Sequence, residues 1–164
     1  MDYSFLPKRY WDYLILAIII FVSLIIFYFL MSRLLKKYEH EKQQLKQVER
    51  IVNQIVEYSN NFIEFMTIFH SRSKFNPDKI DKIGESLTLN VSKMTSLVML
   101  YFVRNKDVTN FNDVINKCNE HYTELQNRVV PPRPMSQIEF EAMRDDLNEQ
   151  FTNLIKIAQE AKYI

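Results

Sequence analysis

The chain has 164 residues and a formal net charge of +1, because 21 Lys and Arg residues balance 20 Asp and Glu residues. This balance provides no broad positive field, so a nucleic-acid partner is not expected. A single glycine, Gly84, and a single cysteine, Cys118, exclude the glycine-rich nucleotide-binding loops and an internal disulfide framework. Long helices joined by few loops remain, and the sequence predicts an all-α protein.

The N-terminal part contains a long apolar run. Residues 14–31 read LILAIIIFVSLIIFYFLM, with no charge and with Ser23 as the one polar side chain. As a helix the run spans about 27 Å, enough to cross the hydrocarbon layer of a membrane. A cleaved signal peptide is the alternative, but the run is longer than usual for one and no small-x-small cleavage site follows Met31. We therefore predict a short tail over residues 1–12 and an uncleaved transmembrane helix over residues 13–31.

Basic and aromatic residues flank this run at both ends. More Lys and Arg follow the span than precede it, which favours a cytoplasmic C-terminal domain, in the plasma membrane or in the inner membrane of a bacterium. The opposite orientation stays open, because a basic N-terminus also precedes anchors that point the other way. The residues expected at the membrane interface are Lys8, Arg9, Trp11, Arg33, Lys36 and Lys37.

The helical pattern continues beyond the span, since no Gly or Pro occurs between Leu14 and Pro77. Residues 32–44 form a charged juxtamembrane stalk, predicted to be a solvated helix; a coiled coil between protomers is the alternative, although Glu41 interrupts its apolar stripe. Beyond the stalk, apolar or tolerated residues recur at spacings of three and four, which predicts one amphipathic helix reaching about Phe69. They are Leu45, Val48, Val52, Ile55, Ser59, Phe62, Met66 and Phe69.

Three further amphipathic helices follow. Asn76-Pro77-Asp78 is typical of a helix start, and the helix that it opens is expected to end near Arg104. Residues 105–107 are predicted to be the connector to a third helix, which prolines 131, 132 and 134 stop. Ser136 and Glu139 have the spacing of a capping box at the start of the fourth helix. Gly84 lies inside the second helix, where it indicates close approach of a neighbouring helix.

Short connectors between helices of this length favour antiparallel neighbours. The predicted fold is therefore an antiparallel up-down four-helix bundle over residues 45–164, continuous with the transmembrane helix. In this arrangement residues 70–75 and 130–135 meet at the end far from the membrane. Residues 105–107 and Ile164 lie at the membrane end.

No catalytic or cofactor signature is found, so the chain is not expected to be an enzyme or to hold a metal. Four-helix bundles that bind two iron ions use Glu-x-x-His pairs, but the residues three before the three histidines are Lys37, Thr67 and Cys118. Cys118 and His121 share a helix face, yet Cys118 falls within the apolar stripe and is expected to be structural. The carboxylates are expected to form a solvated surface, among them Glu39, Glu41, Glu49, Asp145, Asp146 and Glu149.

These observations favour a membrane-anchored interaction or regulatory module that binds a protein partner. The two loops far from the membrane are rich in basic residues and prolines, so an acidic partner is expected there. The alternative is an oligomerising membrane effector, such as a phage-type lysis protein or toxin, that self-associates through stalk and span. The candidate partner-binding residues are His70, Arg72, Lys74, Arg128, Pro131, Arg133 and Pro134.

Overall fold

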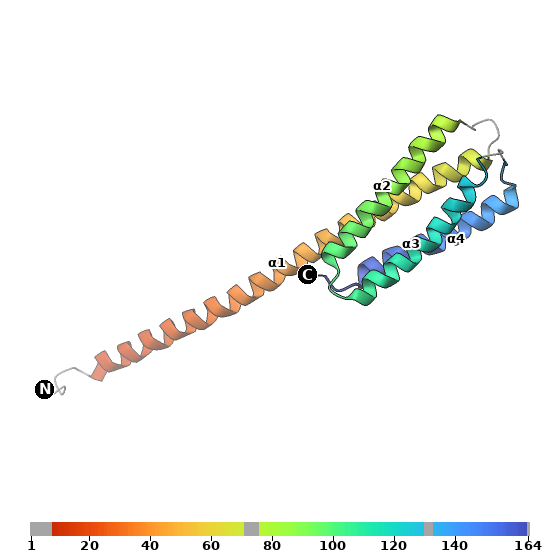
Figure 1. Cartoon of the computed structure of the whole chain (residues 1–164). Coiled ribbons are helices and arrows are strands. Elements are labelled where there is room, and N and C mark those ends of the chain that lie inside the picture. The colour runs from red at the N-terminus through yellow and green to blue at the C-terminus, as the bar shows by residue number, and fades with distance from the viewer. Residues whose placement is uncertain (1–7, 71–75, 130–132, 164) are drawn as a thin grey trace. The chain divides into compact units, whose positions relative to one another are not determined.

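The computed structural model describes residues 8–70, 76–129 and 133–163, and in these ranges the chain is all-helical, as predicted, with no β-strand. Four helices follow one another, α1 (Lys8–His70), α2 (Pro77–Tyr101), α3 (Asn105–Gln126) and α4 (Gln137–Glu160) (Figure 1). The chain divides into two compact units, residues 1–43 and residues 44–164.

The first unit holds the apolar part of α1. Of the described helices, α1 alone is long and apolar enough to cross a membrane, a property that it shares with signal sequences. Every residue from Ala17 to Met31 is exposed, so nothing in this unit covers the apolar side chains. The Ser23 hydroxyl donates to the Ile19 carbonyl at 2.6 Å, which satisfies the one polar side chain of the run. Residues 33–43 are also exposed.

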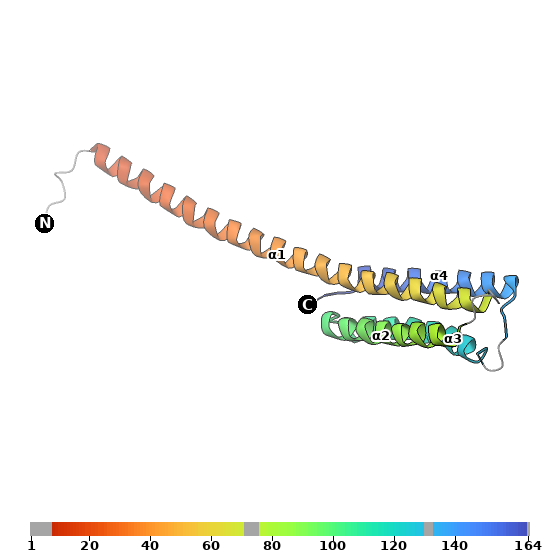
Figure 2. The same cartoon turned by 90° about the horizontal axis from the view of Figure 1, so that it is seen from above.

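The second unit is a helical bundle. Figure 2 shows it as two layers, with the later part of α1 beside α4 and with α2 beside α3. Aromatic side chains join the helices: the rings of Phe62 and Phe151 lie 6.3 Å apart between α1 and α4, and those of Phe65 and Tyr122 lie 5.4 Å apart between α1 and α3. The buried cluster draws on all four helices and lies wholly within residues 51–163. The unit therefore has a hydrophobic core of its own.

Two helix starts occur where local sequence predicts them. The Asn76 side chain accepts hydrogen bonds from the backbone N–H groups of Asp78 and Lys79. At the start of α4, the Ser136 hydroxyl accepts from the Glu139 N–H at 3.2 Å, and the Glu139 carboxylate accepts from the Ser136 N–H at 2.8 Å. Each cap satisfies backbone donors that the helix leaves without a partner.

The connector between α2 and α3 differs from the prediction. Helix α2 ends at Tyr101, and residues 105–107 form the first turn of α3 instead of a loop. The cause is a contact with the end of the chain: the Val103 N–H donates to the Lys162 carbonyl at 2.9 Å, and Phe102 pairs with Tyr163 in an isolated antiparallel bridge. Extended backbone at 102–104 is thus stabilised by residues some 60 positions away.

The buried face of α1 also begins later than its periodicity predicts. Leu45 is 69% exposed, whereas Ile51 and Ile55 are fully buried. Leu45 opens the predicted stripe, but it lies near the end of the bundle, where too few neighbouring side chains cover it.

At each end of the bundle, segments that are far apart in the sequence contact one another. The Met135 N–H donates to the Phe69 carbonyl at 2.9 Å, which joins the described flanks of the two long loops. Residues 71–75 and 130–132 within those loops lie outside the described residues. At the other end, the Asp107 carboxylate accepts from the Lys162 N–H at 3.4 Å. Ile164 also lies outside the described residues.

Candidate functional site

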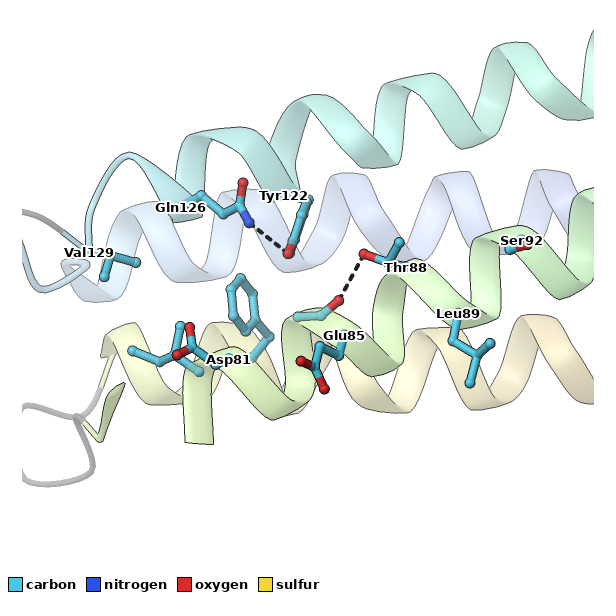
Figure 3. Close-up of a pocket in the computed structure, with 11 residues that line it drawn as sticks. Asp81, Glu85, Thr88, Leu89, Ser92, Tyr122, Gln126 and Val129 are labelled. Carbon is cyan, nitrogen blue, oxygen red and sulfur yellow. Dashed lines mark hydrogen bonds between the residues drawn. The ribbon is translucent and has the colours of Figure 1, made fainter. Parts of the chain in front are cut away.

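A groove lies between α2 and α3, with α1 contributing to its lining (Figure 3). It has a volume of about 830 Å³, which falls in the range of ligand and peptide sites. Its apolar side chains come from all three helices and from the turn after α3. The residues lining this α2–α3 groove are Phe65, Ile80, Asp81, Gly84, Glu85, Thr88, Leu89, Ser92, Tyr122, Gln126 and Val129.

Gly84 and Tyr122 set the spacing of the two helices. A Cβ atom placed on Gly84 would lie 2.8 Å from the Tyr122 hydroxyl oxygen, closer than carbon and oxygen pack. Tyr122 accepts a hydrogen bond from the Gln126 amide at 2.7 Å, and the Thr88 hydroxyl donates to the Gly84 carbonyl at 3.0 Å (Figure 3). Where close approach of a neighbouring helix was predicted, Gly84 makes room for the end of the Tyr122 side chain of α3.

The groove has an acidic wall. Asp81 and Glu85 lie one turn apart on α2 and both line the groove, and neither forms an ion pair within the described ranges. Two of the three lysines of α2 lie toward α1: Lys79 pairs with Glu64 of α1 at 2.7 Å, and Lys93 lines a separate surface pocket between α1 and α2. Helix α2 thus presents the carboxylates of Asp81 and Glu85 to the groove and the amines of Lys79 and Lys93 toward α1. A ligand of this groove would meet two carboxylates that form no ion pair within the described ranges.

The basic residues predicted to bind a partner differ in their surroundings. Arg128 is only 17% exposed in its side chain and pairs with Glu124 at 2.9 Å and Glu139 at 3.0 Å. The Arg128 guanidinium and the Ser136 backbone hold the pKa of Glu139 down to about 2. The charge of Arg128 is therefore matched within the chain, and this residue joins α3 to α4.

The remaining predicted partner residues lie around the same end of the bundle. The His70 ring packs on Phe140 with a centroid separation of 4.7 Å. Arg133 and Pro134 are exposed. Arg72, Lys74 and Pro131 fall outside the described residues.

The predicted membrane-interface residues all belong to α1. Arg33, Lys36 and Lys37 are exposed, and the Lys37 amine lies 3.8 Å from the Glu41 carboxylate. Lys8, Arg9 and Trp11 belong to the first turn of the helix, and their side chains lie outside what the structure describes.

Asp146 departs from the solvated surface expected for the acids. It is half-buried and pairs with His121 across α3 and α4, and it also accepts from the Gln150 amide at 3.1 Å. The hydrogen bond from His121, followed by that from Gln150, lowers the pKa of Asp146. His121 therefore has a structural partner of its own.

Cys118 is fully buried, as its place in the apolar stripe predicts. Burial raises the pKa of its thiol to about 12, with a smaller contribution from the Asp146 charge. A protonated, enclosed thiol is a poor nucleophile and a poor metal ligand. Among the described residues, no group of three or more His, Cys, Asp or Glu side chains is placed to hold a metal ion.

Comparison with known proteins gives no assignment, since no family model, curated protein or solved structure matches the chain. The groove itself was missed by sequence reasoning, because its lining comes from three helices. The isolated Gly84, with carboxylates three residues before it and one after it, was the available signal. It indicated a helix contact but not an opening beside it.

Proposed function

We propose that the chain is a membrane-anchored interaction module whose α2–α3 groove binds a segment of a protein partner. In this proposal residues 13–31 cross the membrane and residues 45–164 form an antiparallel up-down four-helix bundle in the cytoplasm. The exposure of the apolar run supports the anchor, because fifteen consecutive uncovered residues from Ala17 to Met31 are costly in water and favourable in lipid.

The antiparallel arrangement is supported by the order of cross-helix pairs. Arg50, early in the bundle part of α1, donates to the Tyr101 hydroxyl at the end of α2, at 3.0 Å. Glu64, later in α1, pairs with Lys79 at the start of α2. Residue numbers that rise along one helix as they fall along the other are the pattern of antiparallel neighbours.

The observation that supports a binding function is that Asp81 and Glu85, which form no described ion pair, lie beside apolar side chains of the same groove. A partner segment that places Lys or Arg against Asp81 and Glu85 and an apolar side chain against Leu89 or Val129 would match both. Such complementarity acts on association rate and specificity. The proposed partner surface is therefore the α2–α3 groove and not the basic loops predicted from the sequence, where Arg128 is already paired.

Site-specific photocrosslinking in cells tests this function. A photoreactive amino acid at Ser92, on the groove, is expected to yield a defined adduct that Asp81→Lys with Glu85→Lys abolishes. The same probe at Asn148, on the exposed side of α4, is the matched control and should yield none. An adduct at Arg133 alone would restore the basic loops as the partner surface, and one at Lys36 alone would favour the oligomerising effector. A reporter fused after Ile164 that is active only outside the membrane would contradict the cytoplasmic orientation.

A further inference from the structure

One end of the bundle combines exposed apolar side chains with an excess of positive charge. We call this the basal end and define it as residues 44–50, 99–107 and 159–163. Three described contacts hold these segments together: Gln44 Nε2 donates to the Tyr163 carbonyl at 3.4 Å, Val103 N–H to the Lys162 carbonyl, and Lys162 N–H to the Asp107 carboxylate. The end is therefore a built surface drawn from three parts of the chain.

Large apolar side chains stand exposed on this surface. Leu45 is 69% exposed, Met99 64%, Leu100 60% and Val103 50%. Phe102 and Tyr163, by contrast, are each 5% exposed and pack edge to face against each other. The buried aromatic pair closes the core, so the four exposed side chains are not needed to cover it. Four exposed apolar side chains at one end of the bundle are available for contact with an apolar surface.

The charge of the basal end is predominantly positive. Its five cations are Lys46, Arg50, Arg104, Lys106 and Lys162, all exposed. Its three carboxylates are Glu49, Asp107 and Glu160, and Asp107 is half-buried and bonded to the Lys162 backbone. The exposed cations therefore outnumber the exposed acids at this end, in contrast to the acidic wall of the α2–α3 groove.

We propose that the basal end binds the surface of an anionic lipid bilayer. A surface that carries both Lys or Arg and exposed aliphatic side chains matches a bilayer interface. The anionic headgroups attract the cations, and the apolar side chains are buried at the boundary of the acyl chains. A protein partner fits less well, because the centres of protein interfaces are depleted in Lys. This inference does not rest on partner binding by the groove, and its residues are distinct from those of the predicted interface at Arg33, Lys36 and Lys37.

A polarity-sensitive fluorophore at Val103 tests the proposal in the full-length chain. The label is attached through Val103→Cys in a Cys118→Ala background, and the protein is reconstituted by detergent removal into phosphatidylcholine alone or with phosphatidylserine. We expect a blue shift and quenching by spin-labelled lipid only with phosphatidylserine. About 1 M salt, where the screening length falls to about 3 Å, should reverse both changes.

Two controls decide between lipid contact and a general effect of reconstitution. The same label through Asn127→Cys, at the opposite end of α3, should not respond to phosphatidylserine. The triple variant Arg104→Gln, Lys106→Gln and Lys162→Gln should abolish the response at Val103. Each cation near an anionic surface increases the affinity for it about fivefold, so removing three should lower the affinity roughly 100-fold. An equal response in both lipid mixtures, or at both label positions, would overturn the proposal. The label reports contact between the basal end and lipid, so its result can be interpreted whether or not residues 13–31 insert into the bilayer. Alkaline extraction measures that insertion separately.

Discussion

Single polar side chains determine which helices of the bundle are neighbours. Asn90 of α2 is only 1% exposed, and its amide is satisfied when its nitrogen faces the Ser86 carbonyl and its oxygen faces Asn61 of α1, each at 3.1 Å. His121 with Asp146 joins α3 to α4 in the same way. A buried polar group without such partners is costly, so the contacts of Asn90 disfavour other registers of α1 against α2, whereas the partly exposed pair of His121 and Asp146 has a smaller effect.

The contact of Gly84 with Tyr122 yields a prediction at the residue scale. Inside a helix, Ala is more stable than Gly by about 1 kcal/mol, but here the added Cβ would meet the Tyr122 oxygen at 2.8 Å. Gly84→Ala should therefore gain less than that amount, or lose stability, in the natural background. In a Tyr122→Phe background, which lacks the oxygen, the full gain should return. Free energies of unfolding from denaturant titration of the four variants measure this coupling, and an equal effect of Gly84→Ala in both backgrounds would refute it.

Glu139 makes the stability of the bundle sensitive to acid. Its pKa falls from 4.5 to about 2 on folding because Arg128 and the Ser136 cap stabilise the carboxylate. A lowered folded-state pKa means that this stabilisation is present above about pH 4.5 and is lost as the pH falls from there toward 2. Glu139→Gln should thus lower the denaturation midpoint near neutral pH, and the deficit should shrink across that window. Glu141→Gln removes a carboxylate from the same helix as a control, and a deficit from Glu139→Gln that is constant with pH would contradict the assignment.

At the scale of helices, starts could be read from the sequence better than ends. The caps at Asn76 and Ser136 are local, because the side chain and the backbone groups that it satisfies lie within three residues. The end of α2 at Tyr101 depends on Val103 pairing with Lys162, which no local pattern contains.

The same distinction separates what could and could not be predicted about the site. The buried position of Cys118 follows from helical periodicity, and the close approach at Gly84 follows from a glycine inside a helix. The pairing of His121 with Asp146, and the groove beside Gly84, require knowing which helix faces which. Periodicity also predicted Leu45 to be in the core, but periodicity does not indicate how far along α1 the neighbouring helices extend.

Core truncations test the packing of the helices against one another. Phe62, Leu125 and Phe151 are at most 5% exposed and belong to three different helices. Replacing any of them with Ala should cost about 2 to 5 kcal/mol, since each change removes apolar contacts and leaves a cavity. Leu45→Ala, at a position 69% exposed, is the matched control and should cost less than about 0.5 kcal/mol. Chemical denaturation followed by circular dichroism measures all four, and tolerance of the three core changes would contradict the bundle.

At the scale of the whole chain, one helix serves three physical roles. Within α1, residues 14–31 are apolar and uncovered where described, residues 33–43 are charged and exposed, and Ile51 to Phe69 contribute to a closed core. The proposal of a membrane-anchored module depends on this division. It requires that the first segment be covered by lipid, the second by water and the third by the rest of the bundle.

Hydrogen–deuterium exchange of the full-length chain in lipid nanodiscs measures the three segments of α1 at once. Backbone amides exchange slowly in the hydrocarbon layer, where water is absent, and in a packed core, whereas an isolated solvated helix opens readily. We expect residues 14–31 and 51–69 to be strongly protected and residues 33–43 to exchange much faster than either. Exchange over residues 14–31 as fast as over residues 33–43 would contradict the membrane anchor, and with it the central claim.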